Sequence, residues 1–302
     1  PSIQNAIPIP YFGTNVFAAP GIGTISGLVM FGLGAMWLQS RANKAHSKGE
    51  GYGVDTQESE KLTDGVSSQG HMPVLLALLP LLLVIGVNAL FTYAIFPSVD
   101  FSNIKELYPK LEPAKQTGLW SLIIALVVAC SSLILFRLGK WNNLKETVNK
   151  GVLGSMLPIF NTASEVGYGA VVASLAGFVV IRDMVLNVSS NPLISEAVAM
   201  NVLAGITGSS SGGMSIALQT LGADYLAMAN AAGISPELLH RIAALAAGCL
   251  DTLPHSGAVI TLLAICGMTH KQSYGNVAMC TVVIPMVSVA VAITLGTVFG
   301  SF

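Results

Sequence analysis

Long apolar segments alternate with short polar ones along most of the chain. A helix needs roughly 20 mostly apolar residues to cross the hydrocarbon core of a bilayer. Four segments meet this requirement with little interruption, namely Asn15–Gln39, Pro73–Phe96, Leu119–Phe136 and Val277–Phe299. The pattern therefore predicts a membrane-spanning helix in each of them.

Three further apolar segments are long enough but are interrupted by polar residues and glycines: Val152–Ile181, Leu193–Leu221 and Pro236–Cys266. Unpaired backbone groups in hydrocarbon cost several kcal/mol each, so irregular backbone persists there only where protein or a water-filled cavity covers it. We expect the first of these segments to fold back as a re-entrant hairpin and the other two to cross. The fold class is then an all-α polytopic membrane protein, with about six transmembrane helices and one hairpin.

Polar segments divide the chain into four regions. Ser40–Met72 is charged, rich in Gly and Ser and without apolar periodicity, so it predicts an exposed loop. Gly139–Lys150 has apolar residues at helical spacing among lysines, a pattern typical of an interfacial amphipathic helix. The predicted regions are 1–39 with the first helix, 40–72 as the loop, 73–150 with scaffold and amphipathic helices, and 151–302 with the broken helices.

The first break, Leu157–Gly169, reads L-P-I-F-N-T-A-S-E-V-G-Y-G, and Pro158 interrupts the helix there. About 30 residues cannot form two full spans at 1.5 Å per residue, but they suit a re-entrant hairpin with this cluster at its tip. A hairpin tip offers helix-end amides to a ligand. Its polar residues are Asn161, Thr162, Ser164 and Glu165.

The second break, Gly205–Gly213, reads G-I-T-G-S-S-S-G-G, and seven of its nine residues are Gly or Ser. This composition unwinds a helix and leaves hydroxyls, amides and carbonyls facing a cavity. Alternatively, such hydroxyls bond back to their own helix and mark only close packing. The density of the cluster favours a substrate site, with side chains from Thr207, Ser209, Ser210 and Ser211.

The third break, Gly248–Gly257, contains Asp251, Pro254 and His255 in an otherwise apolar run. A charged side chain at membrane depth is costly and is a functional candidate by default. Asp251 and His255 would share one helix face if the helix continued through Pro254, and the plain alternative is a pair that satisfies itself at a helix end. With Glu165, they are our candidates for a proton-coupling site, since buried carboxyl groups and imidazoles can exchange protons near neutral pH.

Composition excludes several function classes. The chain is 53% hydrophobic and 10% charged, whereas soluble domains carry about 25% charged residues. A net charge of −1, from 14 basic and 15 acidic residues, gives no basic field for nucleic acid. The four cysteines lie in apolar runs without metal-ligand or disulfide spacing, so we expect neither a metal nor a cofactor.

Three motifs carry a family resemblance: Asn161–Gly169, Gly205–Met214, and Leu250–Thr261, which reads L-D-T-L-P-H-S-G-A-V-I-T. At these residues the chain resembles the gluconate permease (GntP) family of the ion-transporter superfamily. The resemblance implies a multi-pass inner-membrane symporter for gluconate, related sugar acids or short hydroxy acids such as 3-hydroxybutyrate. H⁺ is the implied coupling ion, with Na⁺ as the alternative.

The resemblance also implies two inverted repeats that move as an elevator, each with a hairpin and an unwound helix. Asn161 and Thr162 match the polar hairpin tip, and Gly208–Gly212 matches the unwound helix. The chain corresponds to the second repeat, with the end of the inter-repeat link in residues 1–39. Because it opens at Pro1 without an initiator Met, we expect it to lack the first repeat. The expected partners are that repeat, a small carboxylate, the lipid bilayer and a second copy of the chain.

Two other function classes fit parts of the sequence. Gly208–Gly212 matches G-x-S-x-G with Ser210 as nucleophile and His255 as its base, which would suit an intramembrane serine hydrolase. No strand pattern precedes the motif, as a nucleophile elbow requires. An anion channel would need a continuous pore of repeated weak sites, whereas the polar residues gather at three breaks. Both remain alternatives to a transporter that is not an enzyme.

Overall fold

The structure is a computed structural model that describes residues 3–50, 74–107, 116–136 and 143–302. Within these ranges the regular elements are all helices, and no strand occurs. The predicted all-α class is therefore confirmed for the described part of the chain. Residues 51–72 of the predicted polar loop and residues 139–142 of the predicted amphipathic helix lie outside the described ranges.

Four helical segments are long and apolar enough to cross a membrane, by length and composition. They are α3 (Pro20–Ser47), Leu78–Ser98, α7 (Thr117–Phe136) and His270–Phe299. The second consists of α5 (Val74–Leu90) with a π-helical turn and a short 3₁₀ turn, and the fourth of α14 (His270–Ala278), a π-helical turn and α15 (Ile284–Phe299). The four uninterrupted spans predicted from hydropathy are thus all present.

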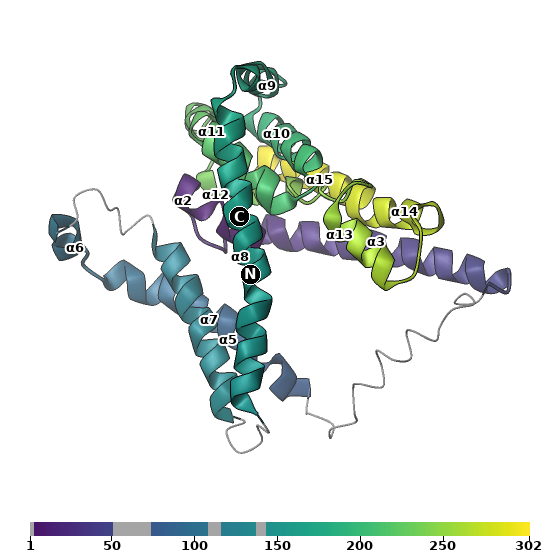
Figure 1. The fold of residues 1–302 in the computed structure, drawn as a ribbon. Helices are drawn as coiled ribbons and strands as arrows, with labels where there is room; N and C mark the ends of the chain where they lie inside the picture. Colours follow the sequence, from purple (N-terminus) through teal and green to yellow (C-terminus); the bar gives the residue numbers. More distant parts are fainter. Residues whose placement is uncertain (1–2, 51–73, 108–115, 137–142) are drawn as a thin grey trace.

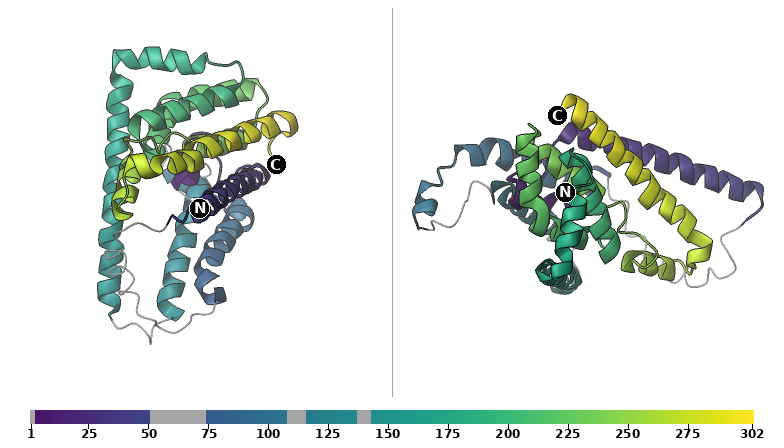
Figure 2. Two further views of the ribbon diagram at one scale, coloured as in Figure 1. Left: turned by 90° about the vertical axis from the view of Figure 1, so that its right-hand side faces the viewer. Right: turned by 90° about the horizontal axis from the view of Figure 1, so that it is seen from above.

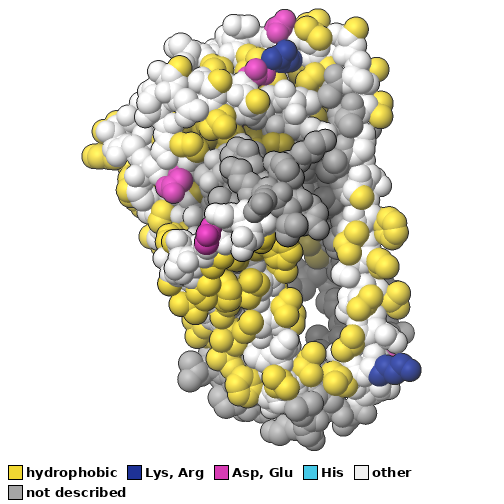
Figure 3. Space-filling view, turned by 90° about the vertical axis from the view of Figure 1, so that its left-hand side faces the viewer, with side chains coloured by type: hydrophobic (Ala, Val, Ile, Leu, Met, Phe, Trp, Pro, Cys, Tyr) yellow, Lys and Arg dark blue, Asp and Glu magenta, His cyan; other side chains and the backbone are white. Residues whose placement is uncertain are grey.

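These helices expose apolar side chains to an unusual extent. Phe31 on α3 is 76% exposed, and Val127 on α7 is 59% exposed. Figure 3 shows apolar side chains spread over the lower half of one face, with few charged groups. Exposed apolar surface on long helices is typical of contact with lipid, because water penalises it. The chain is accordingly a helical membrane protein.

The helices form two bodies that one long helix connects (Figures 1 and 2). The upper body packs around an apolar core that includes Met200, Leu218 and Leu239. The lower body is α5 packed against α7, with Val84, Ala125 and Ala129 between them. The upper body contains α9 (Ala176–Leu186), α10 (Pro192–Thr207), α11 (Ser210–Ala231), α12 (Pro236–Ala246), α3 and α15.

The connecting helix α8 (Leu144–Ser174) corrects the predicted hairpin. It runs without interruption through Leu157–Gly169, and the chain turns only at Leu175, whose backbone is extended. A proline removes one intrahelical hydrogen bond, and membrane helices tolerate that loss, so Pro158 alone does not end the helix. Leu144–Lys150 likewise forms the first turns of α8 rather than a separate interfacial helix. The re-entrant hairpin prediction is therefore wrong for this structure.

Candidate functional site

The second predicted break is present and has a defined geometry. Helix α10 ends at Thr207, Gly208 adopts a left-handed conformation with φ of 64°, and Ser209 caps α11. The Gly212 amide donates to Ser209 Oγ at 3.2 Å. Left-handed backbone favours glycine, and serine is a preferred N-cap. The sequence Gly208–Ser209 therefore specifies the turn between α10 and α11, which is called the corner below.

Helices α10 and α11 cross at very short range beside this corner. A Cβ atom placed on Gly213 would lie 2.3 Å from the Cα of Ala204, closer than real Cβ contacts come. Only glycine allows the two backbones to approach in this way. This close packing of α10 against α11 fixes the position of the turn between them.

The third predicted break is also present, between α12 and α13 (Gly257–Ile265), and it packs against the second. Ser256 Oγ donates to the carbonyl oxygen of Gly208 at 3.0 Å. A Cβ atom on Gly208 would lie 3.3 Å from Cδ2 of His255, so the imidazole edge lies directly on this corner. Two polar breaks that are far apart in the sequence thus form one site.

Ser210 connects three segments of the chain. Its hydroxyl lies near the carboxylate of Asp251, and Gln4 Nε2 donates to Ser210 Oγ at 2.8 Å. Gln4 belongs to the short helix α1 (Ile3–Ala6). Asp251 Oδ1 is buried and has no hydrogen-bond partner among the described residues. The site therefore contains a carboxylate oxygen that can accept a proton or a donor from a ligand.

Asp251 and His255 do not form the pair that the sequence suggested. Residues 247–256 are not helical, so the four-residue spacing does not place the two side chains on one face. The Asp251 carboxylate lies near the Ser210 hydroxyl, while His255 is exposed and lies against Gly208. The helix-face interpretation is wrong, although both residues belong to the same site.

The other hydroxyls of the second break also make local contacts. Thr207 Oγ1 donates to Leu203 O at 2.8 Å, which is the back-bonding alternative noted above. Ser209 Oγ accepts from Gly212 and lies 3.3 Å from Ser211 Oγ. Of the four hydroxyl residues predicted here, the structure thus assigns Ser210 to the contact with the third break.

The residues of the first break lie on α8, which packs against α11. Ser164 lies exposed on α8, in the interior of the helix rather than at a tip. The backbones of Asn161, Thr162 and Glu165 also belong to α8, but their side chains lie outside the described part of the structure. Their predicted roles in substrate and proton binding stay predictions.

Sequence reasoning did not select four polar residues that the fold buries or recruits. Gln4 reaches Ser210, and Arg241 is 8% exposed, with its guanidinium donating to Ala18 O and to Asn5 Oδ1. His240 and Glu196 are fully buried. An acidic or basic residue inside an apolar run is the signal that could have identified Arg241, His240 and Glu196.

Glu196 on α10 is unusual because neither carboxylate oxygen has a partner among the described residues. Burying an ionised carboxylate without a partner costs far more than burying a neutral acid. The hydroxyl of Tyr225 on α11 donates to the neighbouring Ser195 carbonyl at 3.2 Å and lies near this carboxyl group. Glu196 is therefore a second candidate proton carrier, distinct from Asp251.

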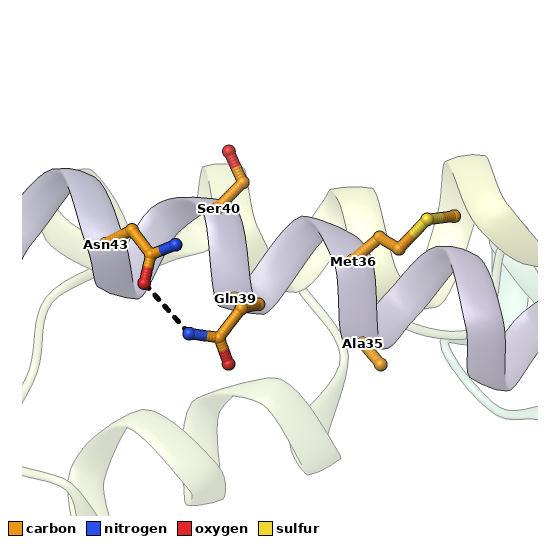
Figure 4. Close-up of a pocket in the computed structure, with 5 residues that line it drawn as sticks. All are labelled: Ala35, Met36, Gln39, Ser40 and Asn43. Atoms are coloured by element: carbon orange, nitrogen blue, oxygen red, sulfur yellow. Dashed lines mark hydrogen bonds between the residues drawn. The ribbon is translucent and has the colours of Figure 1, made fainter.

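An open hollow on α3 does not form a comparable site. Its lining residues all come from this one helix, and Gln39 Nε2 donates to Asn43 Oδ1 at 2.9 Å (Figure 4). A ligand would meet side chains on one side only. The meeting point of the two breaks is thus the better candidate.

Comparison with known proteins supports a general function. The chain is 39% identical over 298 residues to the "Uncharacterized transporter YxjC" of Bacillus subtilis (strain 168). The match covers 94% of this chain and 62% of that protein, so the chain spans less than two thirds of its relative's length. No protein-family model matches the chain, and no solved structure matches it. The chain is thus similar to part of a protein that is named as a transporter.

Proposed function

We propose that this chain forms part of a secondary active symporter for small organic anions. The observation that carries the proposal is the contact between the two helix breaks, where Ser256 Oγ donates to the carbonyl oxygen of Gly208 and the Ser210 hydroxyl lies near the Asp251 carboxylate. Broken helices that meet inside a helical membrane protein are typical of substrate sites in secondary transporters. Similarity to a named transporter supports the same class.

The chemistry of the corner suits a small monoanion. Hydroxyls of Ser209, Ser210 and Ser211 lie at the N-terminal end of α11, where the helix dipole favours negative charge. Neutral donors of this kind suit a single carboxylate with hydroxyl groups. The proposed substrates are gluconate, related sugar acids and short hydroxy acids such as 3-hydroxybutyrate, as the resemblance to gluconate permeases implies.

Proton coupling is proposed to use Asp251. Its buried Oδ1 can take a proton, and the nearby Ser210 hydroxyl connects that event to the corner where substrate would bind. His255, against Gly208, is proposed to respond to the same change. Na⁺ in place of H⁺ is the alternative coupling ion.

The remaining proposals concern the intact protein. Because the chain spans 62% of its relative, we propose that a further repeat completes the binding site. An elevator motion of the broken-helix region, a homodimer and an inner-membrane location follow from the family resemblance. Asn161, Thr162, Ser164 and Glu165 are proposed to join the site in that assembly.

The decisive experiment is uptake by the intact gene product in proteoliposomes. We expect labelled gluconate or 3-hydroxybutyrate to accumulate against its gradient when an inward proton gradient is imposed, and a protonophore to abolish the accumulation. Flux that only equilibrates would indicate a channel. Sodium-driven accumulation would retain symport but change the ion.

A Ser210→Ala variant separates transport from hydrolysis. A transporter should keep partial uptake, because Ser209 and Ser211 hydroxyls remain, whereas a hydrolase would lose all activity with its nucleophile. Fluorophosphonate labelling of the wild-type protein at Ser210 would contradict the transporter proposal.

A further inference from the structure

A cavity of about 180 Å³ lies between the N-terminal segment and α5, on elements that the proposed transport site does not use. Apolar side chains form most of its wall, and two amide side chains interrupt them. Its lining residues are Asn5, Val16, Phe17, Val84, Ile85 and Asn88. At about 30 Å³ per water molecule, its volume corresponds to roughly six waters, which is enough for a small organic molecule.

Asn88 is a buried polar residue in the wall of this cavity. This side chain is 1% exposed, and neither Nδ2 nor Oδ1 has a hydrogen-bond partner among the described residues. Leaving a buried amide unsatisfied costs about 1–3 kcal/mol, and the cost is greater where no water is at hand. Asn88 lies within the candidate span Leu78–Ser98, where a polar residue is retained chiefly for a function. The unmet donor and acceptor therefore point to a ligand.

Arg241 gives the cavity its electrostatic character. The Nη1 group donates to Asn5 Oδ1 at 2.9 Å, and Nη2 lies 3.5 Å from the carbonyl oxygen of Val16, so the guanidinium contacts two lining residues. No carboxylate pairs with Arg241 within the ranges that the structure covers. A buried cation without a counter-ion makes the adjoining space favourable for an anion.

The hydrogen bond from Arg241 fixes which way the side-chain amide of Asn5 is oriented. Because its oxygen accepts from Arg241, its amide nitrogen is the group that can donate to a ligand. Asn88 can supply one further donor and one acceptor. Two amide donors beside a positive charge suit a carboxylate, and the Asn88 oxygen suits a hydroxyl.

We propose that this cavity is a second binding site, which takes one small hydroxycarboxylate. The carboxylate receives hydrogen bonds from Asn5 and Asn88 beside Arg241, and a hydroxyl donates to Asn88 Oδ1. The carbon chain lies against Val84 and Phe17. This inference goes beyond the proposed transport function, because its residues are separate from the Ser210–Asp251 site. Helix α1 lies between the two, with Gln4 bonded to Ser210 and Asn5 at the cavity.

The test counts binding sites on the purified intact protein, with radiolabelled 3-hydroxybutyrate as the probe. We expect two sites per chain in the wild type. Asn88→Leu should remove one site or weaken it at least tenfold, since it deletes both polar groups. Leu82→Ile, on α5 but outside the cavity wall, should leave both sites. A number of sites and affinities that Asn88→Leu leaves unchanged would overturn the proposal and leave only water in the cavity.

A variant with an added negative charge distinguishes an anion site from a cation site. Asn88→Asp has nearly the same shape but adds a negative charge, so it should weaken 3-hydroxybutyrate at this site more than tenfold. Stronger binding of Na⁺ to Asn88→Asp, with 3-hydroxybutyrate binding unaltered, would overturn the proposal in favour of a cation site.

A labelling experiment keeps the proposal testable if Asn88 variants fail to fold. Ile85 is 47% exposed, so a thiol at Ile85→Cys should react with a small methanethiosulfonate, and site-resolved mass spectrometry separates it from the native cysteines. We expect 3-hydroxybutyrate to slow this reaction several-fold, also in a Ser210→Ala background. Equal rates with and without the probe would overturn the second site, while loss of protection only in Ser210→Ala would assign the binding to the transport site.

Discussion

At the scale of single residues, Asp251 is the carboxylate of the candidate site. The Ser210 hydroxyl lies near it, and its Oδ1 is buried without a hydrogen-bond partner in the described structure. A carboxylate can bind and release a proton, and an amide of the same shape cannot. We expect Asp251→Asn to abolish concentrative uptake while leaving counterflow exchange, as measured in proteoliposomes with and without a proton gradient.

Asp224→Asn provides the matched control for this experiment. Asp224 forms an ion pair with Arg182 at 2.7 Å, and both side chains are partly exposed. Such pairs contribute about 0–1 kcal/mol, so the control should keep concentrative uptake. Normal accumulation by Asp251→Asn would rule out its assignment as the coupling residue.

Arg241 is expected to be a stabilising residue as well as a charge beside the cavity. Its guanidinium donates to Ala18 O and Asn5 Oδ1, two positions on different parts of the N-terminal segment. An ammonium group lacks this planar fork, so Arg241→Lys should lose one or more charge-assisted bonds, each worth about 1.5–3 kcal/mol. Thermal unfolding in detergent should show a clear decrease in melting temperature.

Arg182→Lys is the control for that measurement, because its ion pair with Asp224 is partly exposed. Its melting temperature should change little. Equal decreases for the two variants would show that the buried contacts of Arg241 contribute no special stability.

Local composition explains which of these residues could be predicted. Ser210 and Asp251 stand out as polar residues in apolar runs. Their contact with each other, and with Gln4 at a separation of 206 positions, depends on tertiary packing that no local pattern contains. The charge of Arg241 in an apolar run is visible in the sequence, but its contact with Ala18 across 223 positions is not.

At the scale of elements, two of three predicted breaks are real and one is not. Gly208 with φ of 64° and the Ser209 cap provide both a left-handed residue and a start signal for the next helix. Leu157–Gly169 has Pro158 but no residue with positive φ, and α8 continues through it. A proline in an apolar helix is thus a weaker break signal than a glycine followed by a capping serine.

Gly208 should be sensitive to substitution for two separable reasons. Its left-handed backbone would strain an alanine by about 1–2 kcal/mol, and the added Cβ would lie 3.3 Å from His255 and Ser256. Gly233 has φ of 69° with no atom within 4 Å of an added Cβ, so Gly233→Ala carries only the strain. We expect both variants to lose similar stability in thermal unfolding, but only Gly208→Ala to lose substrate uptake.

The comparison isolates the contact between the two breaks. Full uptake by Gly208→Ala would mean that the corner can move away from His255 without consequence, and the proposed site would lose its main support. Loss of uptake in both variants would instead assign the effect to stability.

At the scale of the whole molecule, hydropathy predicted which helices are long enough to cross a membrane but not how they are oriented. α3 and α15 run alongside each other in the upper body, whereas α5 and α7 run in another direction below it (Figures 1 and 2). Only one of these pairs can lie along the normal of a flat bilayer in this arrangement. Helix direction depends on packing between distant segments, and the apolar pattern carries no information about it.

The native cysteines test which surfaces face lipid. Cys130 is exposed on the candidate span α7, and Cys266 is exposed after α13, outside the four candidate spans. Cys249 is buried in the core. In membrane fragments open on both sides, we expect a charged maleimide to label Cys266, to leave Cys130 unlabelled until detergent is added, and to reach Cys249 only after unfolding. Labelling of Cys130 in intact membrane would mean that this face of α7 meets water, and α7 would then line an aqueous path rather than contact lipid.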